Sequence, residues 1–373
     1  MDLVEELSRT LRPAAGGIPL VSTGRARQLA LQRLLYGAAG GAEVEARWRE
    51  DLAAAAGARA VLLGVPSDVG AGYRRGANLG PWALRERLVL DDPGWPARTR
   101  AAGLVDLGDV LAVPQLHHDE MLSEEQLERS RRALYPDLPA AEAAKLPVSP
   151  LSIAERALSR VLAANPGVRV LVLGGDHSAA WPAVKALAAA RPGLGIVQVD
   201  AHTDLLEERL GVRICYGTWS FHANELLRRG GRLVQVGVRA SRHDRGHWES
   251  RHGVRQVWAD EVSRDPAAAA DAVLAAVRAA GVREVYFSND VDGTDERFAD
   301  ATGTPEPGGL HPDFVVGLLR RLGREVGLAG GDVMELAPGI GRTPESSAAT
   351  VALAARYLRE TVEAALGGPG ALG

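Results

Sequence analysis

Three short segments of this chain place histidine and aspartate at spacings that suit metal binding. They read GGDHS (174–178), DAHTD (200–204) and SNDVDGTD (288–295). Along extended chain the side chains alternate between two faces, so groups two positions apart can point together. The candidate ligands selected in this way are His177, Asp200, His202, Asp204, Asp290 and Asp292. Their types and spacing predict a site for divalent cations.

The size of this set indicates two ions rather than one. Four carboxylates and two imidazoles would not pack together near neutral pH without cations, because the acids repel one another. One ion would leave some carboxylates unused, whereas two ions that share bridging aspartates use all the groups. Oxygen-rich ligand sets with few imidazoles and no sulfur favour Mn2+ over Zn2+, and two histidines favour Mn2+ over Mg2+. We therefore expect two Mn2+ ions per subunit.

Each segment also has a simpler structural interpretation. GGDHS alone can be a glycine turn in which Asp176 or Ser178 caps the next helix. DAHTD can be a solvated loop after a strand. The DxDxxD pattern occurs in calcium loops, but no glutamate follows here at EF-hand spacing. The occurrence of all three segments in one chain makes coincidence the weaker explanation.

Each segment follows an apolar run that we expect to be a β-strand. Such runs occupy 59–65, 103–108, 168–174, 194–200, 232–238, 254–259, 283–290 and 325–331. Segments of helical period lie between them, at 79–90, 151–164, 179–190, 221–229, 266–280, 311–322 and 345–366. This alternation is typical of an α/β protein with a buried parallel sheet. Ligands of such sheets bind at the carboxyl ends of the strands, so the three segments should converge.

Two stretches do not follow the strand–helix alternation. Residues 1–57 lack strand signals and are expected to form a helical N-terminal extension, packed on the core or on a neighbouring subunit. Residues 58–373 would then form a single catalytic domain. Within it, residues 113–150 are polar and bounded by proline, which predicts an insertion that is either a lid or a solvated surface helix.

Composition excludes several classes of protein. The formal net charge of -4 removes the attraction to phosphate backbones, so we expect no nucleic-acid partner. The chain has no uncharged apolar run of about 18 residues, so we expect no membrane partner either. Cys215 is the only cysteine, which excludes an internal disulfide and fits a reducing compartment. These features predict a cytoplasmic protein.

The motifs, in this order, resemble those of the arginase/agmatinase (ureohydrolase) family. The likeness extends to GVPSDVGAGYRRGANLGPWALRE (64–86), VDLGDV (105–110), TGTPEPGGL (302–310) and GDVMELAP (331–338), and it covers about residues 59–366. The resemblance implies a doubly wound, mostly parallel eight-stranded sheet flanked by helices in three α/β/α layers. It also implies a homo-oligomer, a trimer or a hexamer.

The resemblance assigns roles to individual residues. One ion would be held by His177, Asp200, Asp204 and Asp290, and the other by Asp200, His202, Asp290 and Asp292. In the family, a hydroxide that bridges the ions attacks a guanidinium carbon, and urea is released. Glu335 matches the acid that pairs with the guanidinium; the alternative is an exposed carboxylate at a strand end.

The sequence departs from the family at the residue that transfers a proton to the leaving amine. Family members usually have a His-Gly pair about a dozen residues after DAHxD, and here Tyr216 precedes Gly217. With an unperturbed pKa of about 10, tyrosine is a weaker acid for this task than an imidazole. His222 lies six residues further on. It either replaces the missing group or is an ordinary surface or core histidine.

Three functions remain open from the sequence. The first is hydrolysis of a linear C–N bond in a small guanidino or amidino compound, agmatinase- or arginase-like, with release of urea. The second is a formimidoylglutamase-like or amide hydrolase, which Tyr216 favours because a less basic leaving group needs less proton delivery. The third is a non-catalytic scaffold stabilised by metal.

Overall fold

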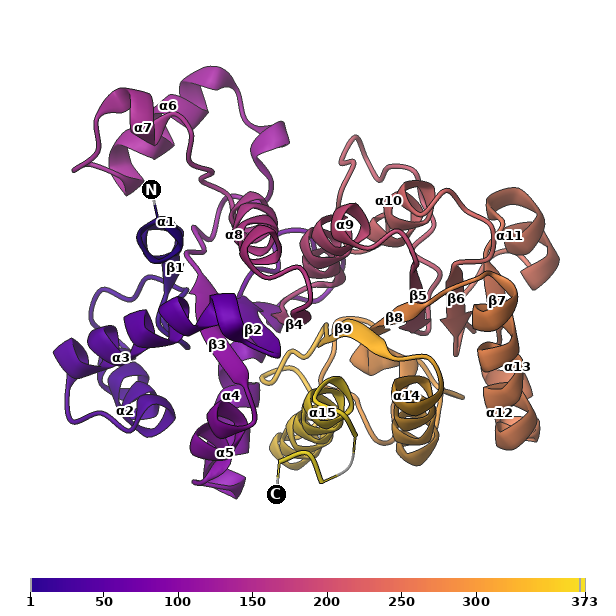
Figure 1. The fold of residues 1–373 in the computed structure, drawn as a ribbon. Helices are drawn as coiled ribbons and strands as arrows, with labels where there is room; N and C mark the ends of the chain where they lie inside the picture. Colours follow the sequence, from indigo (N-terminus) through magenta and orange to yellow (C-terminus); the bar gives the residue numbers. More distant parts are fainter. Residues whose placement is uncertain (1, 369, 373) are drawn as a thin grey trace.

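A nine-stranded sheet forms the centre of the protein. The computed structural model describes residues 2–368 and 370–372, and its strands lie in the order β1-β3-β2-β4-β9-β8-β5-β6-β7 (Figure 1). The strands are β1 (Leu11–Arg12), β2 (Ala60–Val65), β3 (Leu104–Val110), β4 (Arg169–Gly174), β5 (Leu194–Val199), β6 (Leu233–Val236), β7 (Arg255–Val257), β8 (Glu284–Asn289) and β9 (Leu328–Val333). All pairs are parallel except the antiparallel pair of β1 with β3. The eight predicted strands are confirmed, and β1 is an unpredicted ninth.

Helices cover both faces of the sheet and complete a three-layer α/β/α fold. They are α1 (Leu3–Thr10), α2 (Arg25–Tyr36), α3 (Gly41–Ala54), α4 (Gly80–Asp91), α5 (Trp95–Ala101), α6 (Glu124–Leu134), α7 (Ala140–Ala143), α8 (Pro150–Ala164), α9 (Ala180–Ala190), α10 (Trp219–Leu226), α11 (Arg245–His252), α12 (Ala259–Arg264), α13 (Pro266–Ala279), α14 (Pro312–Glu325) and α15 (Pro344–Ala365). Figure 1 shows α8, α9 and α10 on one side of the sheet, and α4, α13, α14 and α15 on the other. No helix in the described part of the chain has the length and apolarity needed to cross a bilayer.

The strands contribute to two hydrophobic cores, one on each face. In β2, Val61 and Leu63 belong to the core beneath α8 and α9, whereas Ala60 and Leu62 belong to the core beneath α4 and α15. Side chains alternate along a strand, so a strand buried on both faces must be apolar at successive positions. The continuous apolar runs in the sequence have this cause.

Several helices begin where the sequence supplies a start signal. Proline occupies the first turn of α4, α8, α13, α14 and α15, where its missing N–H costs no hydrogen bond. The seven predicted helices are confirmed with ends shifted by a few residues; for example, α10 begins at Trp219 and ends at Leu226 rather than spanning 221–229.

The N-terminal segment packs on the core of its own chain. It holds three α-helices and the short strand β1, which pairs Leu11 with Val110 at the edge of the sheet. The Nε1–H of Trp48 donates to the carbonyl of Leu107 at 2.9 Å, and Glu6 pairs with Arg156 of α8. The segment therefore extends the sheet, which the sequence analysis did not predict. The boundary at residue 57 stays a prediction.

The predicted insertion leaves the body of the protein after β3 and returns at α8. It contains α6 and α7, which stand apart from the sheet in Figure 1. Its own small core is formed by Tyr135, Ala143, Leu146 and Val148. A capping box of Ser123 and Gln126 begins α6. The segment is therefore folded locally rather than being an extended loop.

Candidate metal centre

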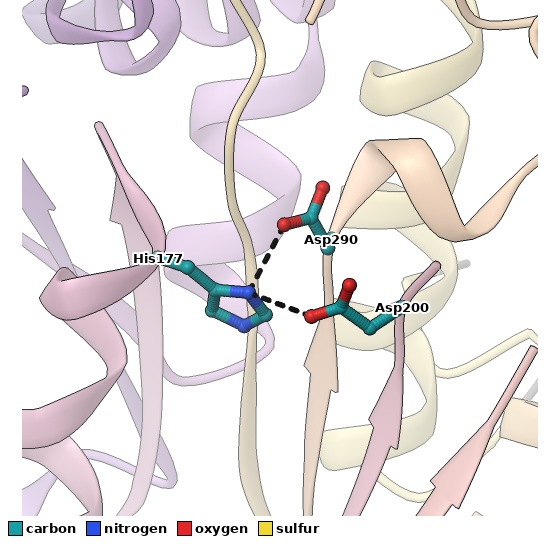
Figure 2. A group of neighbouring side chains, drawn as sticks. All are labelled: His177, Asp200 and Asp290. Atoms are coloured by element: carbon teal, nitrogen blue, oxygen red, sulfur yellow. Dashed lines mark ion pairs between the residues drawn. The ribbon is translucent and has the colours of Figure 1, made fainter. Parts of the chain in front are cut away.

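The carboxyl ends of β4, β5 and β8 bring the three polar segments together. His177 opens a 3-10 turn after β4, Asp200 follows β5 and Asp290 follows β8. Figure 2 shows the three side chains pointing toward one another. The Nδ1 of His177 lies 3.1 Å from Asp200 Oδ2 and 3.0 Å from Asp290 Oδ2. The predicted convergence at this edge is confirmed.

A second group of donors adjoins the first and shares Asp200 with it. The ligand atoms of Asp200, His202 and Asp292 lie within 4.8 Å of one another, as do those of His177, Asp200 and Asp290. His202 Nδ1 is 3.2 Å from Asp292 Oδ2. Asp204 completes the set, with its Oδ2 3.5 Å from His177 Nδ1. We call these six residues the candidate metal centre.

The bonding of His177 fits the role of a metal ligand. Its Nε2–H donates to Ser288 Oγ at 2.9 Å, and the Ser288 hydroxyl donates to Asp332 at 3.0 Å. The buried Nδ1 has no hydrogen-bond partner among the described residues, although carboxylate oxygens lie around it. Because Nε2 carries the hydrogen, the Nδ1 lone pair faces acids and needs a cation or a proton between them.

The electrostatics of the centre also fit cations. Burial, together with neighbouring carboxylates, raises the pKa of Asp204 and of Asp290 well above the usual range. Burial opposes the charged form of Asp200 too, but the attraction of the His177 and His202 imidazoles outweighs it and lowers the pKa of that carboxyl. The environment of Asp204 and Asp290 therefore favours neutralisation of their charge. Divalent ions bound between the carboxylates would supply that neutralisation.

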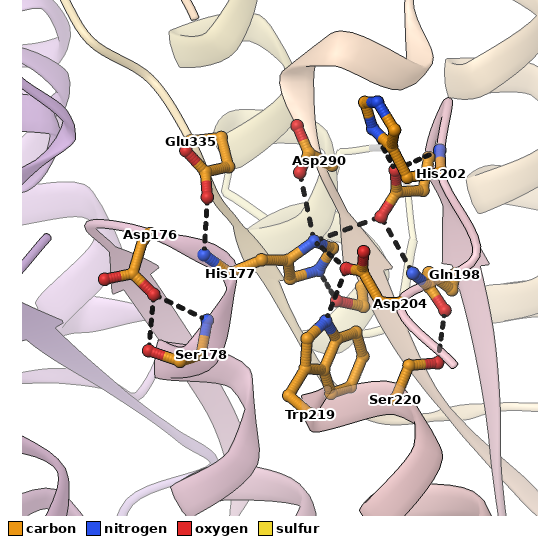
Figure 3. A network of polar contacts seen from close by, with 12 residues as sticks. Asp176, His177, Ser178, Gln198, His202, Asp204, Trp219, Ser220, Asp290 and Glu335 are labelled. Atoms are coloured by element: carbon orange, nitrogen blue, oxygen red, sulfur yellow. Dashed lines mark hydrogen bonds and ion pairs between the residues drawn. The ribbon is translucent and has the colours of Figure 1, made fainter. Parts of the chain in front are cut away.

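Side chains outside the ligand set hold the ligands in position (Figure 3). The indole N–H of Trp219 donates to Asp204 Oδ2 at 3.0 Å, and its ring lies against His177 with 4.6 Å between centroids. Thr304 donates to Asp292 Oδ2 at 2.8 Å. The sequence analysis missed these residues. Such outer partners fix ligand orientation and usually affect metal affinity strongly.

A chain of glutamines reaches the centre through the sheet. Gln198, Gln235 and Gln256 occupy matching register positions on β5, β6 and β7. Gln256 donates to Gln235 and Gln235 donates to Gln198, each at 2.8 Å. Gln198 in turn donates to Asp200 Oδ2 at 2.8 Å. A sequence signal was available, because Gln-Val recurs in all three strands.

Glu335 forms one wall of the centre. It follows β9 with a positive φ of 61° and is only 6% exposed, so the interpretation as an exposed carboxylate is wrong. Its Oε1 accepts the backbone N–H of His177 at 2.9 Å. Burial, with Asp290 and Asp176 nearby, raises the pKa of this carboxyl well above its usual range. A cation beside Glu335 would restore its charged form.

Comparison with known proteins decides the family. Residues 58–362 match the sequence profile of the arginase family. This chain belongs to the arginase family. Membership confirms the resemblance, the fold and the predicted enzyme class, a hydrolase of linear amidine C–N bonds.

Two curated relatives illustrate the likeness. Proclavaminate amidinohydrolase of Streptomyces clavuligerus is 34% identical over 287 residues, which cover 74% of this chain and 80% of that protein. Guanidinobutyrase of Pseudomonas aeruginosa is 31% identical over 300 residues, which cover 77% and 82%. The structure of proclavaminate amidinohydrolase from S. clavuligerus matches with a TM-score of 0.60 at 30% identity, covering 81% of this chain and 91% of that one.

Tyr216, which stands where the arginase family usually has histidine, lies on the loop before α10. Its N–H donates to the carbonyl of Gly70 at 3.2 Å, and the guanidinium of Arg209 lies 5.3 Å from the centre of its ring. Burial raises the pKa of the phenol, so Tyr216 is an even weaker proton donor than free tyrosine.

His222 contacts other parts of the protein. Its Nε2–H donates to the carbonyl of Glu207 at 2.9 Å, and its ring lies edge-on to Trp181 and Phe221. Burial lowers its pKa. None of these partners is a candidate ligand, which favours the interpretation as a structural histidine.

Proposed function

We propose that this member of the arginase family uses two Mn2+ ions to hydrolyse a linear C–N bond of a small guanidino compound, with release of urea. The observation that supports it most is the pair of donor groups that meet at Asp200. Relatives named proclavaminate amidinohydrolase and guanidinobutyrase support the substrate class.

The ligands divide between the two ions as the family resemblance implies. His177, Asp200, Asp204 and Asp290 would hold one ion. Asp200, His202, Asp290 and Asp292 would hold the other. When bound, the pair lowers the pKa of a water molecule and positions it against the substrate carbon. The excess of carboxylate oxygen over imidazole favours Mn2+.

Glu335 would bind the guanidinium of the substrate. The His177 N–H holds Oε1 in place at 2.9 Å. A side chain at Gly303 would begin 3.6 Å from Oε2, so glycine there keeps the approach to this oxygen open. Two parallel N–H groups of a guanidinium match a carboxylate and form charge-assisted hydrogen bonds. Since burial disfavours the lone carboxylate, a cationic substrate is the form that Glu335 selects.

Tyr216 favours a second candidate, a hydrolase of formimino or amide compounds. Its phenol, with the pKa raised by burial, delivers a proton poorly to a basic amine leaving group. A less basic leaving group avoids that difficulty. Tyr216→His discriminates between the two, because a supplied imidazole should speed urea release only if guanidino hydrolysis is the reaction.

The test is product analysis with Mn2+-loaded protein. Agmatine, arginine, guanidinobutyrate, guanidine and formimidoylglutamate are incubated separately, and urea and formamide are measured. We expect urea from at least one guanidino compound, and a loss of about 100-fold in Asp292→Asn. Asp271→Asn, an exposed aspartate paired with Arg321, is the matched control and should stay active.

Other outcomes would replace the proposal. Formamide without urea identifies the second candidate. No product from any compound, with metal retained, identifies the metal-stabilised scaffold. The cytoplasmic location and the trimer or hexamer stay predictions, and light scattering of the purified protein tests the oligomer.

A further inference from the structure

Four consecutive residues near the start of the insertion, His117 to Glu120, contact the body of the protein. His118 Nε2 lies 3.2 Å from Glu155 Oε1 on α8, and the backbone N–H of Asp119 donates to Ser152 Oγ on α8 at 3.0 Å. Glu120 pairs with Arg213. A further contact, from Arg156 of α8 to the carbonyl of Lys145 at 2.8 Å, means that the insertion does not depend on any one of them. His117, the fourth residue, makes a different contact.

His117 is directed to the loop that carries Tyr216. Its side chain is 5% exposed, and its Nε2–H donates to the carbonyl of Ile214 at 2.7 Å. Ile214 lies two residues before Tyr216 in the chain. The Cε1 of His117 lies only 2.6 Å from the point where a side chain at Gly70 would begin. The imidazole therefore packs on Gly70 while it binds Ile214.

Tyr216 contacts the same glycine loop from its own side. Its N–H donates to the Gly70 carbonyl at 3.2 Å, and its phenol lies 2.7 Å from the point where a side chain at Gly72 would begin. An alanine at position 70 would collide with His117, and an alanine at position 72 would collide with Tyr216. The Gly-Ala-Gly spacing thus lets both rings pack on one loop. His117, Ile214, Tyr216 and Gly70 form a closed ring of contacts.

The two nitrogens of His117 have different surroundings. Nε2 makes the bond to Ile214, whereas Nδ1 is buried and has no hydrogen-bond partner among the described residues. Asp176 Oδ1 and Ser178 Oγ lie near the same point beside Gly70, each at 2.9 Å from it. The hydrogen bond that the structure shows is therefore a single donor contact, which an amide can reproduce.

We propose that His117 is a positioning residue, which holds the loop of residues 214–216 and so fixes Tyr216, three residues before the Trp219 that donates to Asp204 of the candidate metal centre. The insertion supplies this residue, and it therefore helps to hold the loop that carries Tyr216. For its effect on turnover the inference rests on the proposed function. Its effect on the loop does not depend on any activity.

The first experiment measures backbone hydrogen exchange of the loop by mass spectrometry. His117→Asn, whose short amide does not reach Ile214, should speed exchange in a peptide covering residues 213–217 by about tenfold, the equivalent of one lost hydrogen bond. His117→Gln should restore protection, because its amide nitrogen can take the place of Nε2. His118→Asn, a matched control on the neighbouring residue, should leave the peptide unchanged.

Equal exchange in His117→Asn and the unmodified protein would overturn the inference, as would equally fast exchange in the Asn and Gln variants. If His117→Asn does not fold, His117→Leu gives the same test. Leucine still packs on Gly70 but has no hydrogen to donate to the Ile214 carbonyl, and the expected and contrary results are those given for His117→Asn.

The second experiment uses turnover, once the unmodified protein has been shown to release urea. His117→Asn and Tyr216→Phe should be non-additive, so that the double variant loses no more kcat/KM than the worse single variant. His118→Asn and Tyr216→Phe should be additive. If the double variant of His117 and Tyr216 instead loses kcat/KM by the product of the two single losses, His117 does not act through Tyr216.

A Gln variant as inactive as the Asn variant, with a shifted pH profile, would show proton transfer by His117 and overturn positioning. If the unmodified protein releases no urea, the proposed function fails. The exchange experiment still decides the role of His117.

Discussion

Replacing Ser288 by alanine should weaken metal binding although it removes no metal ligand. Ser288 Oγ accepts from His177 Nε2 at 2.9 Å and donates to Asp332 at 3.0 Å. All three side chains are buried. Alanine removes the oxygen that accepts the His177 Nε2–H and fixes the orientation of the imidazole. Nδ1 is then no longer held toward Asp200 and Asp290.

The expected size follows from these contacts. Loss of an outer partner typically lowers metal affinity by about 10- to 100-fold, or about 1.4–2.8 kcal/mol at 25 °C. The metal-free protein should also lose about 1–3 kcal/mol of unfolding free energy, because His177 Nε2 is left buried without a partner. The lost hydrogen bond to Asp332 should cost less unfolding free energy, because this carboxylate still accepts the N–H of Asn289 at 2.9 Å.

Calorimetric titration of Mn2+ into metal-stripped protein measures the affinity, and denaturant unfolding measures the stability. Thr99→Val is the matched control. It deletes a buried hydroxyl that donates to Trp95 O at 2.9 Å on α5, so it should cost stability and leave Mn2+ affinity unchanged. If Ser288→Ala loses stability but binds Mn2+ as tightly as the unmodified protein, Ser288 does not set the orientation of His177.

Three further predictions concern the same centre. Glu335→Gln should lower kcat/KM by about 100-fold. The amide oxygen can still accept the His177 N–H, but the side chain has no charge to attract a guanidinium. Full activity of the folded variant in steady-state kinetics would contradict this prediction. Trp219→Phe should weaken Mn2+ binding by about tenfold. It keeps an aromatic ring against His177 but removes the N–H that donates to Asp204. An unchanged Mn2+ titration curve would show that this hydrogen bond does not contribute to metal affinity. In the metal-free protein, burial raises the pKa of Asp332 from 3.8 to about 6, so its contribution to stability is fully present below about pH 4 and is lost as the pH rises through about 6. As the pH rises from about 4 to 6, the melting temperature of the metal-free protein should fall. With Mn2+ present it should rise, because the metal ligands must be deprotonated to bind. Melting temperatures that change in parallel with and without Mn2+ would refute this prediction.

The fold followed from local patterns wherever elements are long enough to show a period. All eight core strands could be predicted, because strands such as β4 and β5 are buried on both faces and therefore mostly apolar. The two-residue strand β1 has no such pattern, and its pairing with Val110 depends on where the chain returns. Helices α5, α11 and α12 were missed for the same reason, since each spans only two turns or so.

The candidate site likewise contains residues that could be predicted from local sequence and residues that could not. The six ligands follow strands directly, so their convergence is a property of a parallel sheet. Ser288 and Trp219 reach the ligands through contacts between segments far apart in sequence, and residue type alone does not reveal them. His117 lies in the insertion, and nothing local indicates that this segment docks on the loop of Tyr216.

The same buried residues specify both the sheet and the centre. The chain from Asp200 through Gln198, Gln235 and Gln256 ends at the Nε1–H of Trp258, 2.9 Å from Gln256 Oε1. Buried amides are costly when unpaired, and these are paired only in one strand register. A slip of one residue in β6 would turn Gln235 to the opposite face and break its bonds with both neighbours. Correct pairing of β5, β6 and β7 therefore orients Asp200. Because the centre is tied to the sheet in this way, changes of substrate are more easily made in the loops above it, among them the one that His117 holds.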